Sequence, residues 1–184
     1  MKNIVFAAFM VLAASLFTGG GARAAGPEDT LYLDLKDGRV VIELYPEIAP
    51  KHVERIKTLA RRGFYNGVVF HRVIDGFMAQ TGDPTGTGMG GSDLPDLKAE
   101  FTKTRHVRGT LSMARSSDPD SANSQFFICF TAAPFLDGQY TAFGRVTSGM
   151  EFVDAIKRGD EANNGQVTDP DKIIRMQVAA DVKE

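Results

Sequence analysis

Residues 30–45 carry the feature that most constrains the fold of this chain. The segments 30–35 (TLYLDL) and 39–45 (RVVIELY) each alternate apolar and polar side chains, and Asp37-Gly38 lies between them. An Asp-Gly pair flanked by alternating segments is the strongest short-range signal of a β-hairpin. We therefore expect an antiparallel sheet with one buried face near the start of the folded part of the chain.

The remaining sequence contains many short strand signals and few helical ones. Helical spacing of apolar residues predicts helices at 50–62, with Pro50 in the first turn and Gly63 as the C-terminal cap, and at 150–157. Strands are expected at 68–73, 77–81, 110–114, 125–130, 140–146 and 172–180, the last of which would close the sheet. This pattern favours a closed or nearly closed antiparallel barrel over a doubly wound sheet.

The first residues have the pattern of a secretory signal peptide. Lys2 precedes an apolar run at 4–17, and Ala22-Arg23-Ala24 matches the small-residue cleavage site of such peptides. No cysteine lies near that site, which argues against a lipoprotein. An uncleaved N-terminal anchor is the alternative.

The rest of the chain fits one globular domain. Of 184 residues, 43% are hydrophobic and 24% are charged, an ordinary globular composition. We expect a signal peptide at 1–24, a domain at 28–184 and a periplasmic location, with secretion into the medium as an alternative. The formal net charge of −2 gives no electrostatic reason to expect binding to nucleic acid or to an anionic membrane. A monomer is the default expectation.

Cys129 is the only cysteine, so the chain cannot form an internal disulfide. It lies in the apolar run FFICF at 126–130. A reactive thiol needs a basic, exposed setting. We therefore expect a buried, unreactive thiol.

A glycine-rich loop at 82–91 matches the dinucleotide-binding pattern through Gly86-x-Gly88-x-x-Gly91. Such a loop must be followed by a helix whose N-terminus holds the pyrophosphate. Here Pro95 and the lack of a helical period argue against that helix. We expect no nucleotide site. The glycines instead permit sharp turns or a close approach of another chain to the backbone.

Standard hydrolytic and metal sites are absent from the sequence pattern. The histidines, His52, His71 and His106, include no pair spaced i, i+4 on a helix, as a zinc protease requires. Each is expected to be a packed or solvated side chain. The carboxylates show no spacing that marks an acid–base pair. We expect neither a metal nor a cofactor.

The segment 70–80 (FHRVIDGFMAQ) places Arg72 among aromatic and apolar residues. On extended chain, alternation puts Phe70 and Arg72 on one face, and Met78 and Gln80 on one face with Phe77 on the other. The turn at Asp75-Gly76 would set the two segments side by side. From the pattern alone, the favoured interpretation is an amphipathic hairpin with a solvated arginine.

Three segments in the same order, FHRVIDGFMAQTGD, LSMARSSDPDSANSQFFI and FLDGQYTAFGRV, resemble the cyclophilin family of peptidyl-prolyl isomerases. The resemblance runs from about residue 30 to residue 178. It implies a mainly β fold, an eight-stranded antiparallel closed barrel capped by two α-helices, with a shallow proline-binding pocket on the outside of the barrel.

The resemblance also implies roles for individual residues. Arg72 stands at the position of the catalytic arginine, and Gln80 is the polar group beside it. The implied substrate-binding residues are His71, Phe77, Met78, Ala114, Arg115, Gln125, Phe127, Phe135, Leu136 and Tyr140. Of these, Phe77, Met78, Phe127 and Leu136 would line the proline pocket, and Ala114, Arg115 and Gln125 would lie along the peptide groove.

Two positions depart from the pattern of the family. Phe135 stands where many members have tryptophan, and Tyr140 where many have histidine. Both keep an aromatic ring, so the pocket should be preserved. The indole is a main contact of cyclosporin in the family, so we expect at most weak binding of that drug.

Three functions are weighed on this basis. The first is an isomerase that accelerates X–Pro isomerisation in exported proteins and so assists their folding. The second is a non-catalytic chaperone or adaptor that holds proline-containing segments; the presence of both Arg72 and Gln80 favours catalysis. The third is a nucleotide-dependent enzyme, which nucleotide binding should stabilise; we expect no such stabilisation.

We also expect the 82–91 loop to pass beside the groove, where its glycines would let a substrate backbone come close.

Overall fold

The structure is a computed structural model that describes residues 25–183. The expected signal peptide at 1–24 lies outside the described residues. The strands are β1 (Thr30–Leu35), β2 (Gly38–Leu44), β3 (Arg72–Ile74), β4 (Met78–Thr81), β5 (Thr110–Met113), β6 (Phe126–Cys129), β7 (Ala142–Ser148) and β8 (Arg175–Val178). The α-helices are α1 (Pro50–Arg61) and α2 (Met150–Asp154). Short 3-10 helices are η1 (Pro27–Asp29), η2 (Pro134–Leu136), η3 (Glu161–Asn163) and η4 (Ala179–Asp181).

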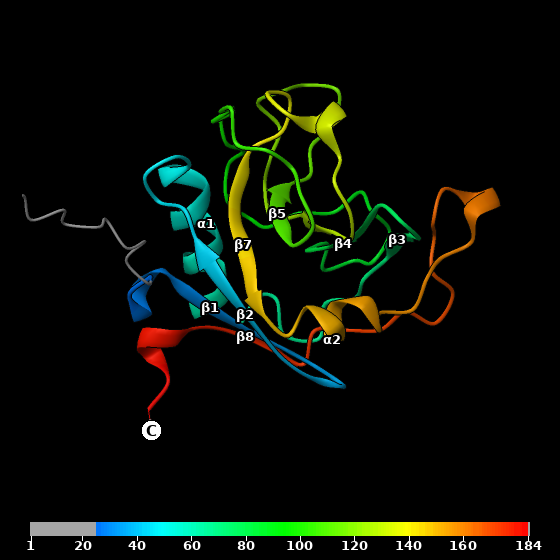
Figure 1. The fold of residues 1–184 in the computed structure, drawn as a ribbon, viewed down its shortest axis with the longest axis horizontal. Coiled ribbons are helices and arrows are strands. Elements are labelled where there is room, and N and C mark those ends of the chain that lie inside the picture. The colour runs from blue at the N-terminus through cyan, green and yellow to red at the C-terminus, as the bar shows by residue number, and fades with distance from the viewer. Residues whose placement is uncertain (1–24, 184) are drawn as a thin grey trace, which may run out of the picture.

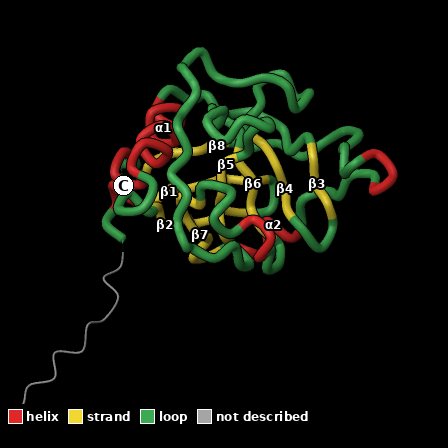
Figure 2. The backbone as a smooth tube through the Cα atoms, turned by 90° about the horizontal axis from the view of Figure 1, so that it is seen from above, coloured by secondary structure: helices red, strands yellow, loops and turns green. Residues whose placement is uncertain are grey.

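The strands form one antiparallel sheet in the order β3-β4-β6-β5-β7-β2-β1-β8. Figure 2 shows them following one another across the molecule, from β1 and β2 beside α1 to β3 on the far side. The expectation of eight antiparallel strands with two α-helices is confirmed within residues 25–183. The expectation of a closed barrel is wrong, because the sheet is an open half-barrel.

The sheet stays open because β3 and β8 do not pair with each other. The free edge of β3 is occupied by a loop: Val73 donates its N–H to Gly165 O at 2.7 Å and accepts from Gly159 N at 2.9 Å. Closure is limited to a short stretch where the chain before β3 meets the chain before β8, through the isolated bridge Val69–Lys172. The strand expected at 172–180 therefore ends the sheet without closing it.

The β1–β2 hairpin forms as the sequence predicts. Its register pairs Leu35 with Gly38, so the connection contains only two residues. Alternate residues of β1, including Leu31 and Leu33, are fully buried. The buried face of this hairpin supplies one wall of the core.

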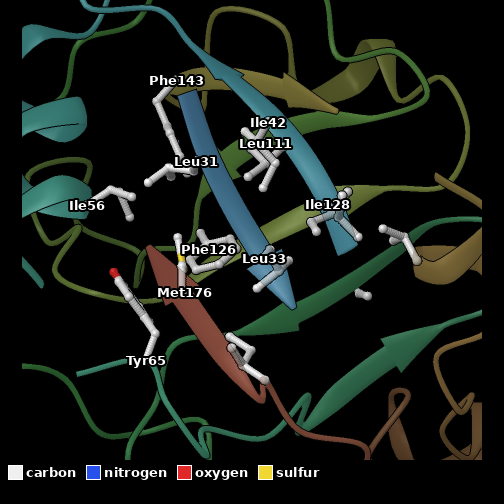
Figure 3. Packing of buried hydrophobic residues seen from close by; sticks show 14 of the residues in the cluster. Leu31, Leu33, Ile42, Ile56, Tyr65, Leu111, Phe126, Ile128, Phe143 and Met176 are labelled. Carbon is white, nitrogen blue, oxygen red and sulfur yellow. The ribbon is translucent and has the colours of Figure 1, made fainter. Parts of the chain in front are cut away.

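The core lies between the concave face of the sheet and α1 (Figures 1 and 3). Tyr65, Phe126 and Phe143 form a chain of edge-to-face contacts, with ring centroids 5.6 and 6.0 Å apart, and Tyr65 donates its hydroxyl to Ser124 O. Helix α1 buries the apolar stripe that its sequence predicts, which includes Ile56. No helix within residues 25–183 has the length and apolar character needed to cross a membrane.

Several elements are shorter than expected. The strands expected at 77–81, 110–114 and 125–130 each lose one or two end residues. The strand expected at 68–73 is observed at 72–74, and the strand expected at 172–180 at 175–178. The strand expected at 140–146 keeps its length but runs from 142 to 148. Helix α1 ends one residue early. Helix α2 stops at Asp154. Ala155 N still donates to Glu151 O, but Lys157 N donates to the carboxylate of Asp171.

The late start of β3 changes the faces expected for its neighbours. Phe70 N donates to Asp171 O, so the chain before Arg72 does not follow the ladder of the sheet. As a result Phe70 is fully buried in the main core, whereas Arg72 faces the outside with Gln80. The expectation that Phe70 and Arg72 share a face is therefore wrong. Phe77 likewise precedes β4 and lies on the same side as Met78, not on the opposite face.

Candidate functional site

The β3–β4 hairpin brings Arg72 and Gln80 together as direct register partners. Arg72 Nη1 donates to Gln80 Oε1 at 3.0 Å. This pairing follows from the local sequence, because the Asp75-Gly76 turn fixes the register of two short strands. The arginine is therefore held rather than freely solvated.

Asn164 holds the same guanidinium from the other side. Arg72 Nε donates to Asn164 O, and Arg72 Nη2 donates to Asn164 Oδ1, both at 3.0 Å. Partial burial lowers the pKa of Arg72 from its ordinary value, but an arginine stays protonated at neutral pH. Three of its five N–H groups are used, so one on each terminal nitrogen remains available. No pattern in the sequence pointed to Asn164.

A pocket of about 400 Å³ with an apolar floor opens beside this guanidinium; we call it the Phe127 pocket. It is lined by Arg72, Phe77, Met78, Gln80, Ala114, Arg115, Phe127, Phe135, Leu136, Gln139 and Tyr140. The structure thus brings together all the expected site residues except His71 and Gln125.

The floor and the rim of the Phe127 pocket differ in exposure. Met78, Phe127 and Leu136 are buried, and the ring of Phe127 meets Tyr140 edge-on at 6.0 Å. Phe135 is 62% exposed and leans on Phe77 at 5.4 Å. A flat apolar ring placed here would contact buried side chains below and aromatic side chains at the rim.

A buried polar chain supports the floor of the pocket. His106 is hydrogen-bonded through Nδ1 to Asp137 Oδ1 and through Nε2 to Ser112 Oγ, both at 2.9 Å, and its ring stacks on Phe127. Hydrogen bonds from the main chain and side chain of His106 lower the pKa of Asp137. The sequence predicted only that His106 is packed or solvated, and it is packed.

A second cavity, of about 500 Å³, continues from the Phe127 pocket; we call it the Gly88 groove. It is lined by Gln80, Gly88, Met89, Gly90, Gly91, Ser92, Asp96, Ala114, Arg115, Ser116, Ser121, Asn123 and Gln125. Gln125 Nε2 donates to Gly88 O and Gly90 O, and Gln125 Oε1 accepts from Gln80 Nε2. A continuous hydrogen-bond chain therefore runs from Arg72 to the glycine-rich loop.

His71 lies apart from both cavities. It is buried beside Gly88, and within the described chain neither ring nitrogen has a hydrogen-bond partner. It lines a smaller cavity of about 280 Å³ that Arg72, Gln80 and Gly88 also border. Burial lowers the pKa of His71, which favours a neutral ring. His71 is thus near the expected site but does not face the Phe127 pocket.

The glycine-rich loop folds around its own carboxylate. The Asp83 side chain accepts from the backbone N–H groups of Thr85, Gly88 and Gly90 and from the hydroxyl of Thr85. A Cβ at Gly90 would collide with Asp83. The glycines therefore serve the folding of the loop, and no helix begins between residues 82 and 109, as a dinucleotide site would require.

Cys129 is fully buried, and burial raises the pKa of its thiol to about 12, so its expected burial is confirmed. Within residues 25–183, no group of three or more His, Cys, Asp or Glu side chains is arranged to hold a metal ion.

Comparison with solved structures identifies the fold. A cyclophilin from Hirschia baltica superimposes with a TM-score of 0.76 at 29% identity, over 86% of this chain and 77% of that one. A cyclophilin-type isomerase from Cryptosporidium parvum, crystallised in the presence of the dipeptide Ala-Pro, gives a TM-score of 0.74 at 30% identity, over 81% and 98%. The half-barrel, with a pocket of aromatic and apolar side chains beside an arginine, is thus that of a cyclophilin.

Sequence comparison then shows the family. The chain belongs to the cyclophilin-type peptidyl-prolyl cis-trans isomerases, whose family model matches residues 30–178. A probable peptidyl-prolyl cis-trans isomerase of Brucella suis is 58% identical over 173 residues, 88% of each chain. A peptidyl-prolyl cis-trans isomerase-like 1 protein of Aspergillus fumigatus is 44% identical over 155 residues, 82% of this chain and 96% of the relative. The protein is therefore a prolyl isomerase.

Proposed function

We propose that this isomerase acts on proline-containing segments of exported proteins and assists their folding, with Arg72 as its catalytic residue. The observation that carries this proposal is the position of Arg72, fixed by Gln80 and Asn164 at the edge of the Phe127 pocket with two N–H groups available. The Cryptosporidium parvum structure obtained with Ala-Pro supports binding of proline-containing peptides.

The chemistry of the X–Pro bond explains why an arginine belongs there. Amide resonance gives a barrier of about 18–20 kcal/mol, so uncatalysed exchange takes about tens to hundreds of seconds. Twisting the bond localises the lone pair on the proline nitrogen, which then accepts a hydrogen bond. A donor at that position stabilises the twisted state more than either planar state, which lowers the barrier.

The hydrogen bond from Arg72 supplies only part of the rate enhancement, so the pocket must supply the rest. A charge-assisted hydrogen bond of about 1.5–3 kcal/mol supplies roughly one or two powers of ten in rate. We propose that Phe77, Met78, Phe127 and Leu136 hold the proline ring while the preceding residue rotates. Both ends of the Gln80 amide are already bonded, so we assign to Gln80 mainly the orientation of Arg72, with one N–H left for a substrate carbonyl.

The glycine-rich loop has a smaller part in this proposal. Gly88 to Ser92 border the Gly88 groove, so a bound peptide would pass beside them. Gly86 and Gly88 have positive φ values of 70° and 86°, which strain other residues. Valine at both positions should therefore raise KM, chiefly by deforming the loop. Unchanged kinetics in a folded variant would reject this role.

The assay on Arg72 tests the proposal. In a protease-coupled assay on an Ala-Pro peptide, Arg72→Ala should lower kcat/KM about 10- to 100-fold, with an unchanged circular dichroism spectrum. Arg175→Ala is the matched control, because Arg175 is exposed on β8 at the opposite end of the sheet from β3. Full activity of Arg72→Ala would reject the mechanism. A wild-type protein that binds the peptide without accelerating exchange would instead indicate a holding chaperone or adaptor.

We further propose that residues 1–24 are removed on export and that residues 28–184 act as a monomeric domain in the periplasm. The support is the charged, apolar and small-residue pattern of the N-terminus. Expression of the full chain in a Gram-negative host, followed by fractionation and mass measurement, tests this. A periplasmic product that begins at Ala25 is expected, and an intact chain in the cytoplasmic fraction would reject export.

A further inference from the structure

A second guanidinium, that of Arg115, borders both cavities. Its Nε and Nη2 donate to Gln139 O at 3.3 and 3.0 Å, and its Nη1 donates to Ser116 O at 2.8 Å. Its Cζ lies 4.5 Å from the centroid of the Tyr140 ring. These contacts fix the plane of the group at the junction of the Phe127 pocket and the Gly88 groove, and one N–H on each terminal nitrogen remains available.

Neither Arg72 nor Arg115 forms an ion pair within residues 25–183. Elsewhere in the described chain, arginines commonly do. Those with a carboxylate partner are Arg39, Arg61, Arg62, Arg108, Arg145 and Arg158. Arg72 and Arg115 share with the buried Arg55 contacts to neutral carbonyl or amide oxygens only. Of these three arginines, only Arg72 and Arg115 line the two cavities.

The carboxylates near Arg115 are directed to other partners. Asp96 Oδ1 accepts from Asn123 Nδ2. Asp118 and Asp120, in the loop after Arg115, accept from the backbone N–H groups of Asp120 and Ala99. The charged side chains that line the two cavities are Arg72, Arg115 and Asp96, so the lining is net positive although the whole chain carries −2.

We propose that Arg115 is a specificity-determining residue, which makes the enzyme favour substrates with a carboxylate side chain close to the proline. The inference rests on the proposed function, since it assumes that the proline occupies the Phe127 pocket. A flanking residue of the bound chain then lies within reach of the junction. There Arg115 presents two N–H groups in the planar geometry that matches a carboxylate.

The expected size of the preference follows from exposure. Arg115 is partly exposed, and ion pairs at such positions are weak and screened by salt. We therefore expect about a two- to fivefold preference at low ionic strength, which should decrease as salt is added. Stacking on Tyr140 and the anchoring carbonyls reduce the entropy lost when the pair forms.

The test compares peptides that differ only in one charge. Glu, Gln or Lys is placed directly before the proline in one series and directly after it in another. Catalysed exchange is measured by NMR without a coupling protease, at peptide concentrations below KM. The readout is the ratio of kcat/KM for the Glu peptide to that for the Lys peptide within each enzyme, so that a general loss of activity cancels.

The wild type should favour Glu over Lys in at least one series. Arg115→Gln should reduce the ratio, Arg115→Glu should invert it, and the exposed control Arg175→Gln should keep it. A wild-type ratio at or below one in both series, or equal ratios in Arg115→Gln and Arg175→Gln, would overturn the role of Arg115 alone. If no peptide is isomerised, the Gln peptides included, both the role of Arg115 and the proposed function are overturned.

Discussion

Asn164 binds the guanidinium of Arg72 twice, through its main-chain carbonyl to Nε and through its Oδ1 to Nη2, each at 3.0 Å. Asn164 adopts a left-handed φ of 53°, which asparagine tolerates better than most residues. The guanidinium of Arg72 is thus oriented by a residue that follows the short helix η3 and is far from Arg72 in the sequence.

Removal of the Asn164 side chain should therefore weaken catalysis without unfolding the protein. Asn164→Gly keeps the carbonyl and the left-handed backbone but loses Oδ1, so kcat should fall about three- to tenfold while KM changes less. Asn164→Asp, which retains an acceptor, should lose less. Asp169→Gly is the matched control, because Asp169 is also exposed with a φ of 53°, whereas the hydrogen bonds to Arg72 come from Asn164. Equal kinetics in Asn164→Gly and Asp169→Gly would contradict this role.

The sequence predicts the contact of Arg72 with its near neighbour Gln80, but not its contact with the distant Asn164. The Asp75-Gly76 turn and the alternation around it are sufficient to pair Arg72 with Gln80. No local pattern connects Asn164 to Arg72, because their contact depends on the loop that occupies the edge of β3. The same loop explains the error about closure: strand number suggested a closed barrel, but closure requires that β3 and β8 both have free edges.

The resemblance to cyclophilins predicted most of the residues that line the pocket, because it assigns residues of separate strands to one surface. It also placed His71 among the substrate-binding residues, whereas alternation sets His71 on the face opposite Arg72, and His71 does not line the Phe127 pocket. Nor does spacing in the sequence reveal that the glycine-rich loop encloses Asp83.

The carboxylate of Asp83 should stabilise the fold at neutral pH. Burial alone would raise the pKa of Asp83, but hydrogen bonds from Thr85, Gly90 and Gly88 outweigh it and lower the pKa from 3.8 to about 2. Because the folded-state pKa is depressed, the stabilisation, about 2 kcal/mol, is complete above the unfolded pKa near 4 and is lost as pH falls towards 2.

Asp83→Asn should accordingly lower the free energy of unfolding by about 2 kcal/mol at pH 7. Urea unfolding at several pH values between 7 and 2 would measure the difference from the wild type, which should shrink below pH 4. Asp37→Asn, an exposed change in the β1–β2 turn, should show little difference. A gap between Asp83→Asn and wild type that stays constant with pH would rule out the carboxylate as its source.

Glu100 caps helix α1 from a distant loop. Ala49, at the N-cap position, provides no side-chain hydrogen bond, and Glu100 accepts instead from the backbone N–H groups of Lys51 and His52 and from His52 Nδ1. Burial lowers the pKa of His52, so a neutral ring can donate this last bond.

Loss of this cap should cost stability. Glu100→Ala should destabilise the fold by about 1–2 kcal/mol and lower Tm by roughly 2–8 °C, as measured by calorimetry. Glu54→Ala, an exposed carboxylate on the same helix, should change Tm much less. Similar losses in the two variants would show that the loss of any carboxylate beside α1, and not the loss of the cap, is responsible.

The thiol of Cys129 should be unreactive in the folded protein. With its pKa raised to about 12 by burial, the thiolate is scarce at pH 8, and the thiolate is the reactive form. A thiol-specific chromogenic reagent should label Cys129 only after unfolding in concentrated guanidinium chloride. A cysteine at exposed Ser148, in Ser148→Cys, should react at once. Rapid labelling of wild type without denaturant would disprove the burial argument.

Phe135 lies at the rim of the Phe127 pocket. Its ring is 62% exposed and rests on Phe77, so it offers apolar contact but no hydrogen-bond donor. The resemblance implies that an indole at this position is a main contact of cyclosporin, and we therefore expect the wild type to bind the drug weakly. Phe135→Trp adds ring area and an N–H donor, together worth about 1.5 kcal/mol or roughly tenfold in Kd.

Titration calorimetry, or inhibition of peptide isomerisation, would measure this gain. Phe101→Trp makes the same change at an exposed phenylalanine that does not line the pocket, and it should leave Kd close to the wild-type value. Equal affinities in the two variants would mean that position 135 does not limit binding, and the tyrosine at 140, where many cyclophilins have histidine, would then be the departure that weakens it.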